Sequence, residues 1–148
     1  MKVSDFLAPR DVMIGVAAPG KRKLLETLAQ KAGAIVDVPP DRLLAELRKR
    51  EELGSTGVGG GVALPHARYH QVSKPIGMLL RLRQPIEFDA VDGELVDIVF
   101  LLLLPETTDG GHLDALASVA RVLRKPAITA ALRAAPDAAQ IYHTLTTA

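Results

Sequence analysis

Cysteine is absent from the 148 residues, and this absence excludes several kinds of chemistry at once. Disulfide bonds, thiol catalysis and cysteine-based zinc sites cannot form. Aromatic residues make up only 3% of the chain, which argues against a surface that stacks the bases of single-stranded nucleic acid. The lack of cysteine fits a reducing compartment, and we expect a cytoplasmic protein.

The chain also lacks an excess of charge of either sign. Eighteen basic and seventeen acidic residues give a formal net charge of +1, so no nucleic-acid partner is expected. The longest apolar run, Ile98 to Leu104, is too short to cross a bilayer. The residues from Met1 to Phe6 lack the apolar core of a signal peptide. We therefore expect a soluble protein that does not insert into a membrane.

Hydrophobic residues, by contrast, make up 48% of the chain, enough for a packed core. No repeat is evident, and the sequence predicts a single domain over residues 1–148. Helical spacing and boundary residues predict five helices. The first covers residues 21–33. The second opens at Pro39-Pro40-Asp41 and has its last turn at Arg48-Lys49-Arg50. The other three cover about 112–124, 126–134 and about 137–145. Gly33 is interpreted as the stop of the first, and Lys21-Arg22-Lys23 as its solvated start.

Short apolar segments in the middle of the chain predict strands. Their ranges are 62–64, 76–82, a short piece at 85–88, and 95–104. Asp92-Gly93 predicts a turn that joins the last two of these strands as a hairpin. The carboxylates around this turn are expected to be solvated at the tip of the hairpin. The resulting order is helix, helix, strands and then helices. It predicts an α/β fold in which a mixed sheet is flanked by helices on both faces.

The glycine-rich stretch from Gly54 to Gly61 resembles a nucleotide loop only superficially. It has no Gly-Lys-Ser/Thr ending, so it is not a P-loop. A strand follows it where a dinucleotide fold needs a helix. Two interpretations remain at this point: a flexible surface loop, or a loop whose missing Cβ atoms leave room and free amides for a partner or an anion.

His66 is the candidate nucleophile among the four histidines. His66 and His70 have the spacing of a zinc pair on a helix, but Pro65 and the preceding strand disfavour a helix there. No metal or cofactor is therefore expected. Pro65 fixes the backbone before the imidazole, and the strand end presents the ring outward. A neutral imidazole is a good nucleophile near physiological pH.

The motif around His66 is long. Glu51 is followed after six residues by Val58-Gly59, and after two more by Val62-Ala63-Leu64-Pro65-His66-Ala67. With the stretch 50–57, Pro85 to Asp89 and His112-Leu113, this pattern resembles the enzyme IIA domains of the fructose/mannitol type in the bacterial phosphotransferase system. The resemblance covers nearly the whole chain and is strongest to the nitrogen-type, regulatory branch. Gly60 stands where Asn is common, and Ala67-Arg68 where Gly-Lys is common.

The resemblance implies a phosphocarrier with no small-molecule turnover of its own. His66 matches the histidine that takes a phosphoryl group, on the ring nitrogen far from the backbone, from a histidine-phosphocarrier protein. His112 matches a second active-site histidine and Arg50 a nearby arginine, both in contact with the phosphoryl group. The targets would be regulated proteins. Two alternatives remain: a sugar-transport IIA that passes phosphate to a IIB component, and a binding module that is not phosphorylated.

Overall fold

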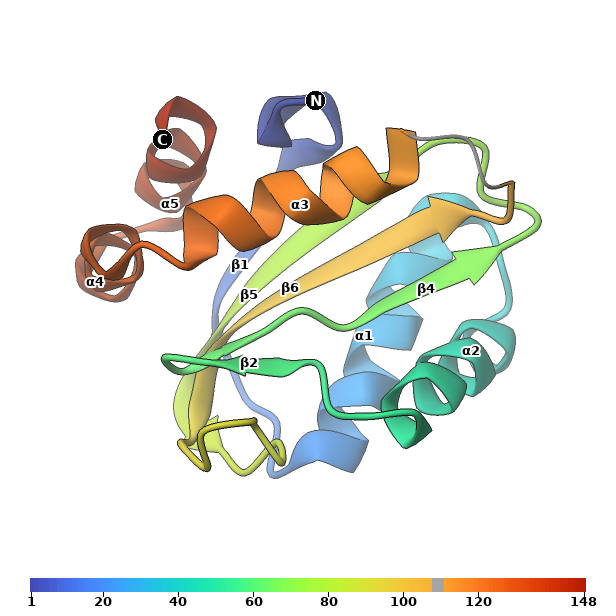
Figure 1. Cartoon of the computed structure of the whole chain (residues 1–148), viewed down its shortest axis with the longest axis horizontal. Helices are drawn as coiled ribbons and strands as arrows, with labels where there is room; N and C mark the ends of the chain where they lie inside the picture. The colour runs from blue at the N-terminus through green and yellow to red at the C-terminus, as the bar shows by residue number, and fades with distance from the viewer. Residues whose placement is uncertain (108–110) are drawn as a thin grey trace.

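A six-stranded mixed sheet lies between two groups of helices in the computed structural model (Figure 1). The structure describes residues 1–107 and 111–148, except for the side chains of residues 111 and 112. The strands are β1 (Leu7–Val16), β2 (Gly57–Gly59), β3 (Val62–Ala63), β4 (His66–Tyr69), β5 (Ile76–Ile86) and β6 (Val96–Pro105). The helices are α1 (Lys21–Val36), α2 (Pro40–Glu52), α3 (Gly111–Leu123), α4 (Pro126–Ala134) and α5 (Ala138–Thr147), and a 3₁₀ turn η1 (Val3–Asp5) precedes β1.

The central strand β6 is buried along almost its whole length. It pairs with β5 in antiparallel register and with β3 and β4 in parallel register. Alternate β6 residues face opposite layers: Val99, Leu101 and Leu103 pack under α1 and α2, whereas Phe100, Leu102 and Leu104 pack under α3, α4 and α5. An apolar run without polar interruption is typical of a strand covered on both faces. The predicted fold class is confirmed.

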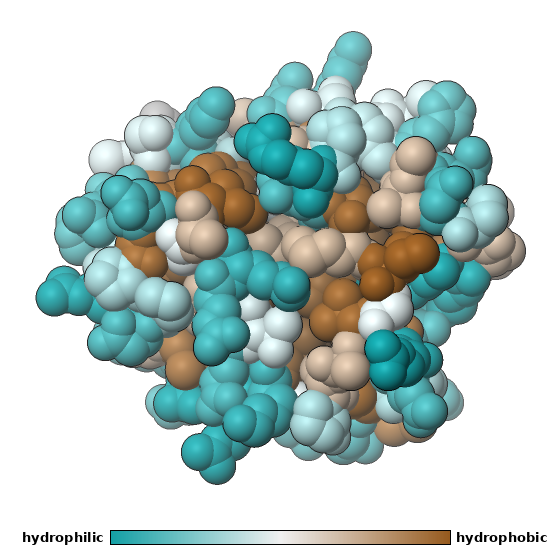
Figure 2. Space-filling view, turned by 180° about the vertical axis from the view of Figure 1, so that it is seen from behind, coloured by the Kyte–Doolittle hydropathy of each residue, from teal (hydrophilic) through white to brown (hydrophobic). Residues whose placement is uncertain are grey.

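The first strand was missing from the predicted order of elements. β1 lies at the edge of the sheet, parallel to β5, and register shifts interrupt the pairing after Leu7 and after Met13. Seen from behind, the molecule carries several apolar patches separated by hydrophilic side chains (Figure 2). Pro9 and Arg10 are exposed on β1, and both residue types oppose edge-to-edge pairing of sheets.

Gly33 does not end the first helix, contrary to the interpretation of its sequence. α1 continues to Val36, and Asp37 takes the left-handed conformation at φ 55° that closes the helix. Gly33 is instead a point of close approach. A Cβ there would lie 2.6 Å from the carbonyl oxygen of Val38, so only glycine lets the chain turn back against the helix.

Most other boundaries follow the sequence. α2 begins at Pro40 and α4 at Pro126, each with proline at the first helical position. The separate strand expected at residues 85–88 does not exist, because β5 continues through an irregular stretch to Ile86. No helix within the described residues is long and apolar enough to cross a membrane.

Candidate functional site

His66 is the first residue of β4, directly after the proline that interrupts the strand. β3 and β4 both pair with β6 in the same register: Val62 lies opposite Ile98, and His66 opposite Leu102. β3 and β4 are therefore two parts of one strand that is interrupted at Leu64-Pro65. The break does not release the chain from β6, because the carbonyl oxygen of Pro65 still accepts the amide of Leu102 at 3.0 Å.

Two hydrogen bonds orient the imidazole ring of His66. Nδ1 lies 2.9 Å from the carbonyl oxygen of Leu64, and Nε2 lies 3.3 Å from Nε of Arg50. A carbonyl can only accept and a guanidinium can only donate. The ring is thus neutral, with its proton on Nδ1 and an unprotonated Nε2.

The surroundings of His66 lower its pKa below the usual 6.5. Burial is the largest cause, because removing water disfavours the charged imidazolium. The hydrogen bond to Leu64 acts in the opposite direction, and the positive charges of Arg50 and Arg68 lower the pKa further. The lowered pKa keeps the ring neutral at physiological pH, which is the form that a candidate nucleophile needs.

The C-terminal turn of α2 places Arg50 beside this ring. Its Nη1 donates to the carbonyl oxygen of Gly54 at 2.8 Å while Nε points to His66. The Gly54 bond holds the guanidinium across the end of the helix, where cations are favoured. The structure thus brings together two of the three predicted site residues, which lie 16 positions apart in the sequence.

A polar cluster behind Arg50 fixes the segment that leads to His66. The side chain of Glu51 is only 7% exposed and pairs with Lys21 at 3.0 Å. It also accepts hydrogen bonds from the amide and the hydroxyl of Thr56. The carbonyl oxygen of Thr56 in turn accepts a hydrogen bond from the amide of Leu64 at 2.9 Å. Since Leu64 holds Nδ1 of His66, Glu51 is coupled to the ring through one continuous chain of contacts.

Lys21 is therefore more than the solvated start of a helix. Besides Glu51, its ammonium lies 3.7 Å from Asp89 and 4.6 Å from the centroid of the buried Phe88 ring. The prediction for the run 21–23 holds only for Arg22 and Lys23, which remain mostly exposed. Lys21 ties the first turn of α1 to the site.

The glycines before His66 are used within the protein and do not line the His66 cleft. They form the tight turn between β2 and β3. The amide of Gly60 donates to Asp92 at 3.0 Å, and its carbonyl oxygen accepts from Arg133 at 2.7 Å. Gly61 has φ +80°, and a Cβ there would collide with Nη2 of Arg133. The expectation of free amides is wrong at Gly60, because its amide and its carbonyl oxygen already have internal partners.

His66 lines a cleft of about 320 Å³ between α2, β4 and α3. Lys49, Arg50 and Arg68 supply positive charge, and Glu46 is paired with Lys49. Leu53 and Leu113 stand at the rim with 84% and 65% of their surface exposed. A basic cleft with exposed apolar residues at its edge suits contact with another protein around a phosphate.

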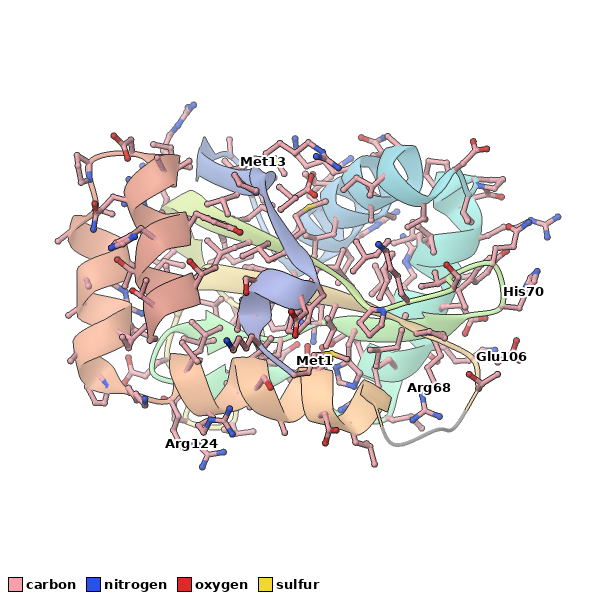
Figure 3. All side chains as sticks on the ribbon, turned by 90° about the horizontal axis from the view of Figure 1, so that it is seen from above. Met1, Met13, Arg68, His70, Glu106 and Arg124 are labelled. Atoms are coloured by element: carbon pink, nitrogen blue, oxygen red, sulfur yellow. The ribbon has the colours of Figure 1, made fainter. Side chains whose placement is uncertain are left out.

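The third predicted residue, His112, belongs to the first turn of α3, but its side chain lies outside the described residues. The next residue on the helix, Leu113, lines the His66 cleft. His70 lies after β4 with its ring 4.5 Å from that of Tyr69 and is exposed, and His143 is exposed on α5. Figure 3 shows Arg68 and His70 at one end of the molecule and Arg124 at the other. The described residues contain no cluster of three potential metal ligands.

Comparison with known proteins places this geometry in a family. Residues 5–148 match the model of the phosphoenolpyruvate-dependent sugar phosphotransferase system, EIIA 2. The chain belongs to this family, the type 2 IIA domains. It is 41% identical over 145 residues to a nitrogen regulatory protein of Bradyrhizobium diazoefficiens, which covers 98% of this chain and 95% of that protein.

Solved type 2 IIA structures share the fold. The crystal structure of the nitrogen regulatory protein IIA-Ntr from Neisseria meningitidis superposes with a TM-score of 0.92 at 31% identity, covering 97% of this chain and 99% of that one. The mannitol IIA of Escherichia coli, solved in complex with phosphorylated IIB, gives a TM-score of 0.79 at 14% identity. The match covers 95% of this chain and 97% of that one. The predicted family and its nitrogen-type branch are confirmed.

Sequence reasoning gave no role to Glu51, Thr56, Leu64 and Leu53. Glu51 was visible in the motif, but its buried position depends on how α1 and the segment after α2 bring Lys21 and Thr56 to it. Leu53 follows the cationic end of α2, and its exposure could be found only in the folded chain.

Proposed function

We propose that this type 2 IIA domain is a phosphocarrier that accepts a phosphoryl group on Nε2 of His66 and regulates partner proteins through its phosphorylation state. The donor is a phosphorylated histidine-phosphocarrier protein. The observation that carries the proposal is the orientation of the ring: Nδ1 is held by Leu64, and Nε2 faces Arg50 at the cleft.

In the proposed step, the lone pair of Nε2 attacks the phosphorus of the donor's phosphohistidine. The P–N bond to the donor breaks, and its electron pair returns to the donor imidazole. A P–N bond to His66 forms, while the Nδ1 proton stays in its hydrogen bond to Leu64. In-line transfer of this kind depends on positioning and on stabilisation of charge.

Arg50 has to exchange partners during this step. Its Nε–H now points at the nitrogen that is to be phosphorylated. An incoming phosphoryl group displaces that bond, and the guanidinium can then donate to the phosphoryl oxygens. The bond to Gly54 remains available as a pivot. Arg68 and Lys49 add positive charge around the cleft, and we assign His112 as a second group that contacts the phosphoryl oxygens.

Labelling with a donor protein phosphorylated from [³²P]phosphoenolpyruvate tests the acceptor. We expect an acid-labile, base-stable label that is lost in His66→Ala and retained in the matched control His70→Ala. The ³¹P and ¹⁵N spectra should place phosphorus on Nε2. Full labelling of His66→Ala, or phosphorus on Nδ1, would contradict the proposal. Full labelling rates in His112→Ala would remove the role assigned to His112.

The transport alternative differs in where the phosphate goes next. Transfer of label from the phosphorylated domain to a sugar-specific IIB protein would favour it. The E. coli mannitol IIA forms such a complex. A wild-type chain that accepts no label from any histidine-phosphocarrier protein would favour a binding module instead.

A further inference from the structure

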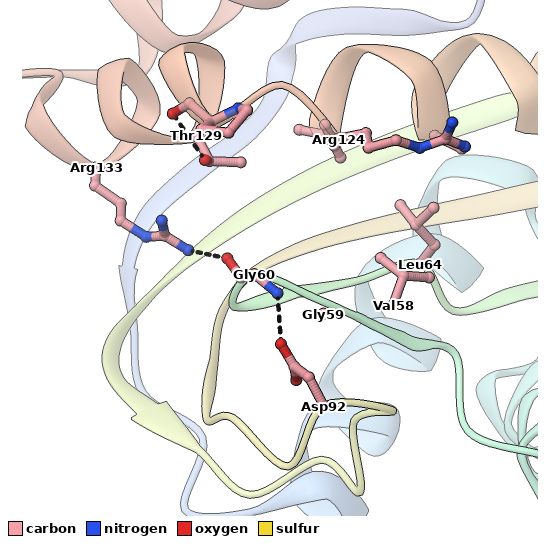
Figure 4. Close-up of a pocket in the computed structure, with 11 residues that line it drawn as sticks. Val58, Gly59, Gly60, Leu64, Asp92, Arg124, Thr129 and Arg133 are labelled. Atoms are coloured by element: carbon pink, nitrogen blue, oxygen red, sulfur yellow. Dashed lines mark hydrogen bonds between the residues drawn. The ribbon is translucent and has the colours of Figure 1, made fainter.

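A second cleft, whose lining does not include His66, lies between the β2–β3 turn and the corner where α3 meets α4 (Figure 4). Its volume is about 660 Å³, which is within the usual range for small-molecule sites. Its apolar lining comes from both sides: Val58 of β2 and Leu64 of the break between β3 and β4 on one, and Ala120, Leu123 and Pro126 from the helices on the other. Neither His66 nor Arg50 lines it.

The two ends of this cleft differ in charge. At one end Arg133 is paired within the protein, since its guanidinium binds Asp97 at 2.9 Å and the carbonyl oxygen of Gly60 at 2.7 Å. Asp92 accepts the amides of Gly60 and Glu94, and these bonds lower its pKa, so it stays ionised. Arg124 stands apart from this network over Leu64 (Figure 4). Within residues 1–107 and 111–148, no carboxylate pairs with it.

We propose that this cleft binds a small organic anion with an apolar body, whose carboxylate or similar head group pairs with Arg124 and whose body covers Leu64 and Leu123. Charge complementarity selects the sign of the ligand, because the only other charged groups in the lining are the engaged Arg133 and Asp92. The apolar walls favour a hydrocarbon or aromatic body over a sugar phosphate.

Leu64 links this cleft to the acceptor histidine. Its side chain lines the cleft, and its carbonyl oxygen holds Nδ1 of His66. A ligand packed on Leu64 therefore contacts the residue that sets the orientation of the ring. This consequence for phosphoryl transfer rests on the proposed function, whereas binding itself does not.

Amide chemical shifts of the unphosphorylated chain, residues 1–148, test the site with two probes of similar shape and opposite charge, octanoate and octylammonium. We expect octanoate to shift residues 58–64 and 120–133 and to bind at least about tenfold more weakly to Arg124→Gln. Arg121→Gln is the matched control, since Arg121 lies one turn earlier on α3 and borders a different hollow beside Met1. Ala120→Trp should fill the cleft and block binding.

Several results would overturn the proposal: equal affinity for octylammonium, unchanged affinity in Arg124→Gln, shifts centred on Leu53 and Leu113, or no shifts at all. Binding of octanoate to His66→Ala separates the two proposals, since the site should survive in a variant that cannot be phosphorylated. A change in the His66 ¹⁵N shifts on adding octanoate is expected in the wild type. Its absence would disprove the link through Leu64 and leave the binding site intact.

Discussion

The carbonyl oxygen of Leu64 lies 2.9 Å from Nδ1 of His66, two residues further along the chain. Because Pro65 between them fixes the backbone, this contact sets both the tautomer and the direction of the ring. The nitrogen that remains available for chemistry is Nε2, at the basic cleft beside Arg50.

The first prediction concerns the protonation of this ring. The neutral form should be the Nδ1–H tautomer, and it should persist as the pH falls through 6.5, since burial and then nearby positive charges keep the pKa of His66 below that value. Long-range ¹H–¹⁵N correlation spectra over a pH series measure both properties. An Nε2–H tautomer, or a midpoint above 6.5, would rule out the proposed orientation.

Arg50→Gln should change His66 in two ways. The pKa of His66 should rise, because a positive charge and a donor to the neutral ring are both removed. Phosphoryl transfer should slow by roughly tenfold to a hundredfold, because this factor corresponds to the free energy that a hydrogen bond to a charged group contributes. The same NMR titration and a rapid-quench labelling assay measure these effects. Lys23→Gln, which removes a mostly exposed cation on α1 away from the cleft, should change neither.

Leu53, one of the exposed leucines beside the His66 cleft, should contribute to binding of the donor protein and not to the stability of the fold. Leu53→Asp leaves an 84% exposed position polar, so the free energy of unfolding should change by less than about 0.5 kcal/mol. Labelling at low donor concentration should fall about tenfold, as for a contact near the centre of an interface. Val91→Asp, at a position 75% exposed and not in the lining of the His66 cleft, is the control. Equal rates in both variants would remove Leu53 from the docking surface.

Glu51→Gln should destabilise the fold. The change leaves Lys21 without its closest carboxylate and weakens the bonds to Thr56. We expect a loss of about 1–3 kcal/mol in urea unfolding, the usual cost of disrupting a buried charged hydrogen bond. Glu52→Gln, at the exposed neighbouring position, should be neutral. If the two variants are equally stable, Glu51 does not hold the segment leading to His66.

Two glycine variants separate backbone strain from collision. Gly93 has φ +76° with open space around it, whereas Gly61 has φ +80° with Arg133 in the way. Gly93→Ala should cost about 1–2 kcal/mol, the price of a left-handed alanine. Gly61→Ala should cost more, because the ion pair of Arg133 with Asp97 must also move. Thermal unfolding of both proteins measures the difference, and equal losses would mean that Arg133 adjusts freely.

The elements that the sequence predicted well have strong local signals. α1 carries leucines at helical spacing, α4 begins at Pro126, and β6 is a continuous apolar run. β1 lacks such a signal because Pro9, Arg10 and Asp11 interrupt its apolar residues, and its pairing shifts register twice. β4 has only four residues, and its partner β6 lies far along the chain. Strands of this kind are defined by tertiary pairing and not by their own composition.

The candidate site, too, has one part that could be predicted from the sequence and one part that depends on tertiary packing. His66 could be found from its motif, whereas its contact with Arg50 depends on the packing of α2 against β4. The glycines were misread because a sequence shows the flexibility of glycine and not the groups that surround it. Asp92 and Arg133, which close that loop, come from 32 and 73 positions beyond Gly60.

The unchanged register of β3 and β4 along β6 has a mechanical consequence. On both sides of Pro65, the chain at His66 is attached to β6, which is buried along almost its whole length. A displacement of its backbone would require the hydrogen bonds to β6 to slip or break together. The proposed acceptor nitrogen is thus a fixed point, and the movements that the proposed phosphoryl exchange requires fall to side chains such as Arg50 and to the partner that approaches.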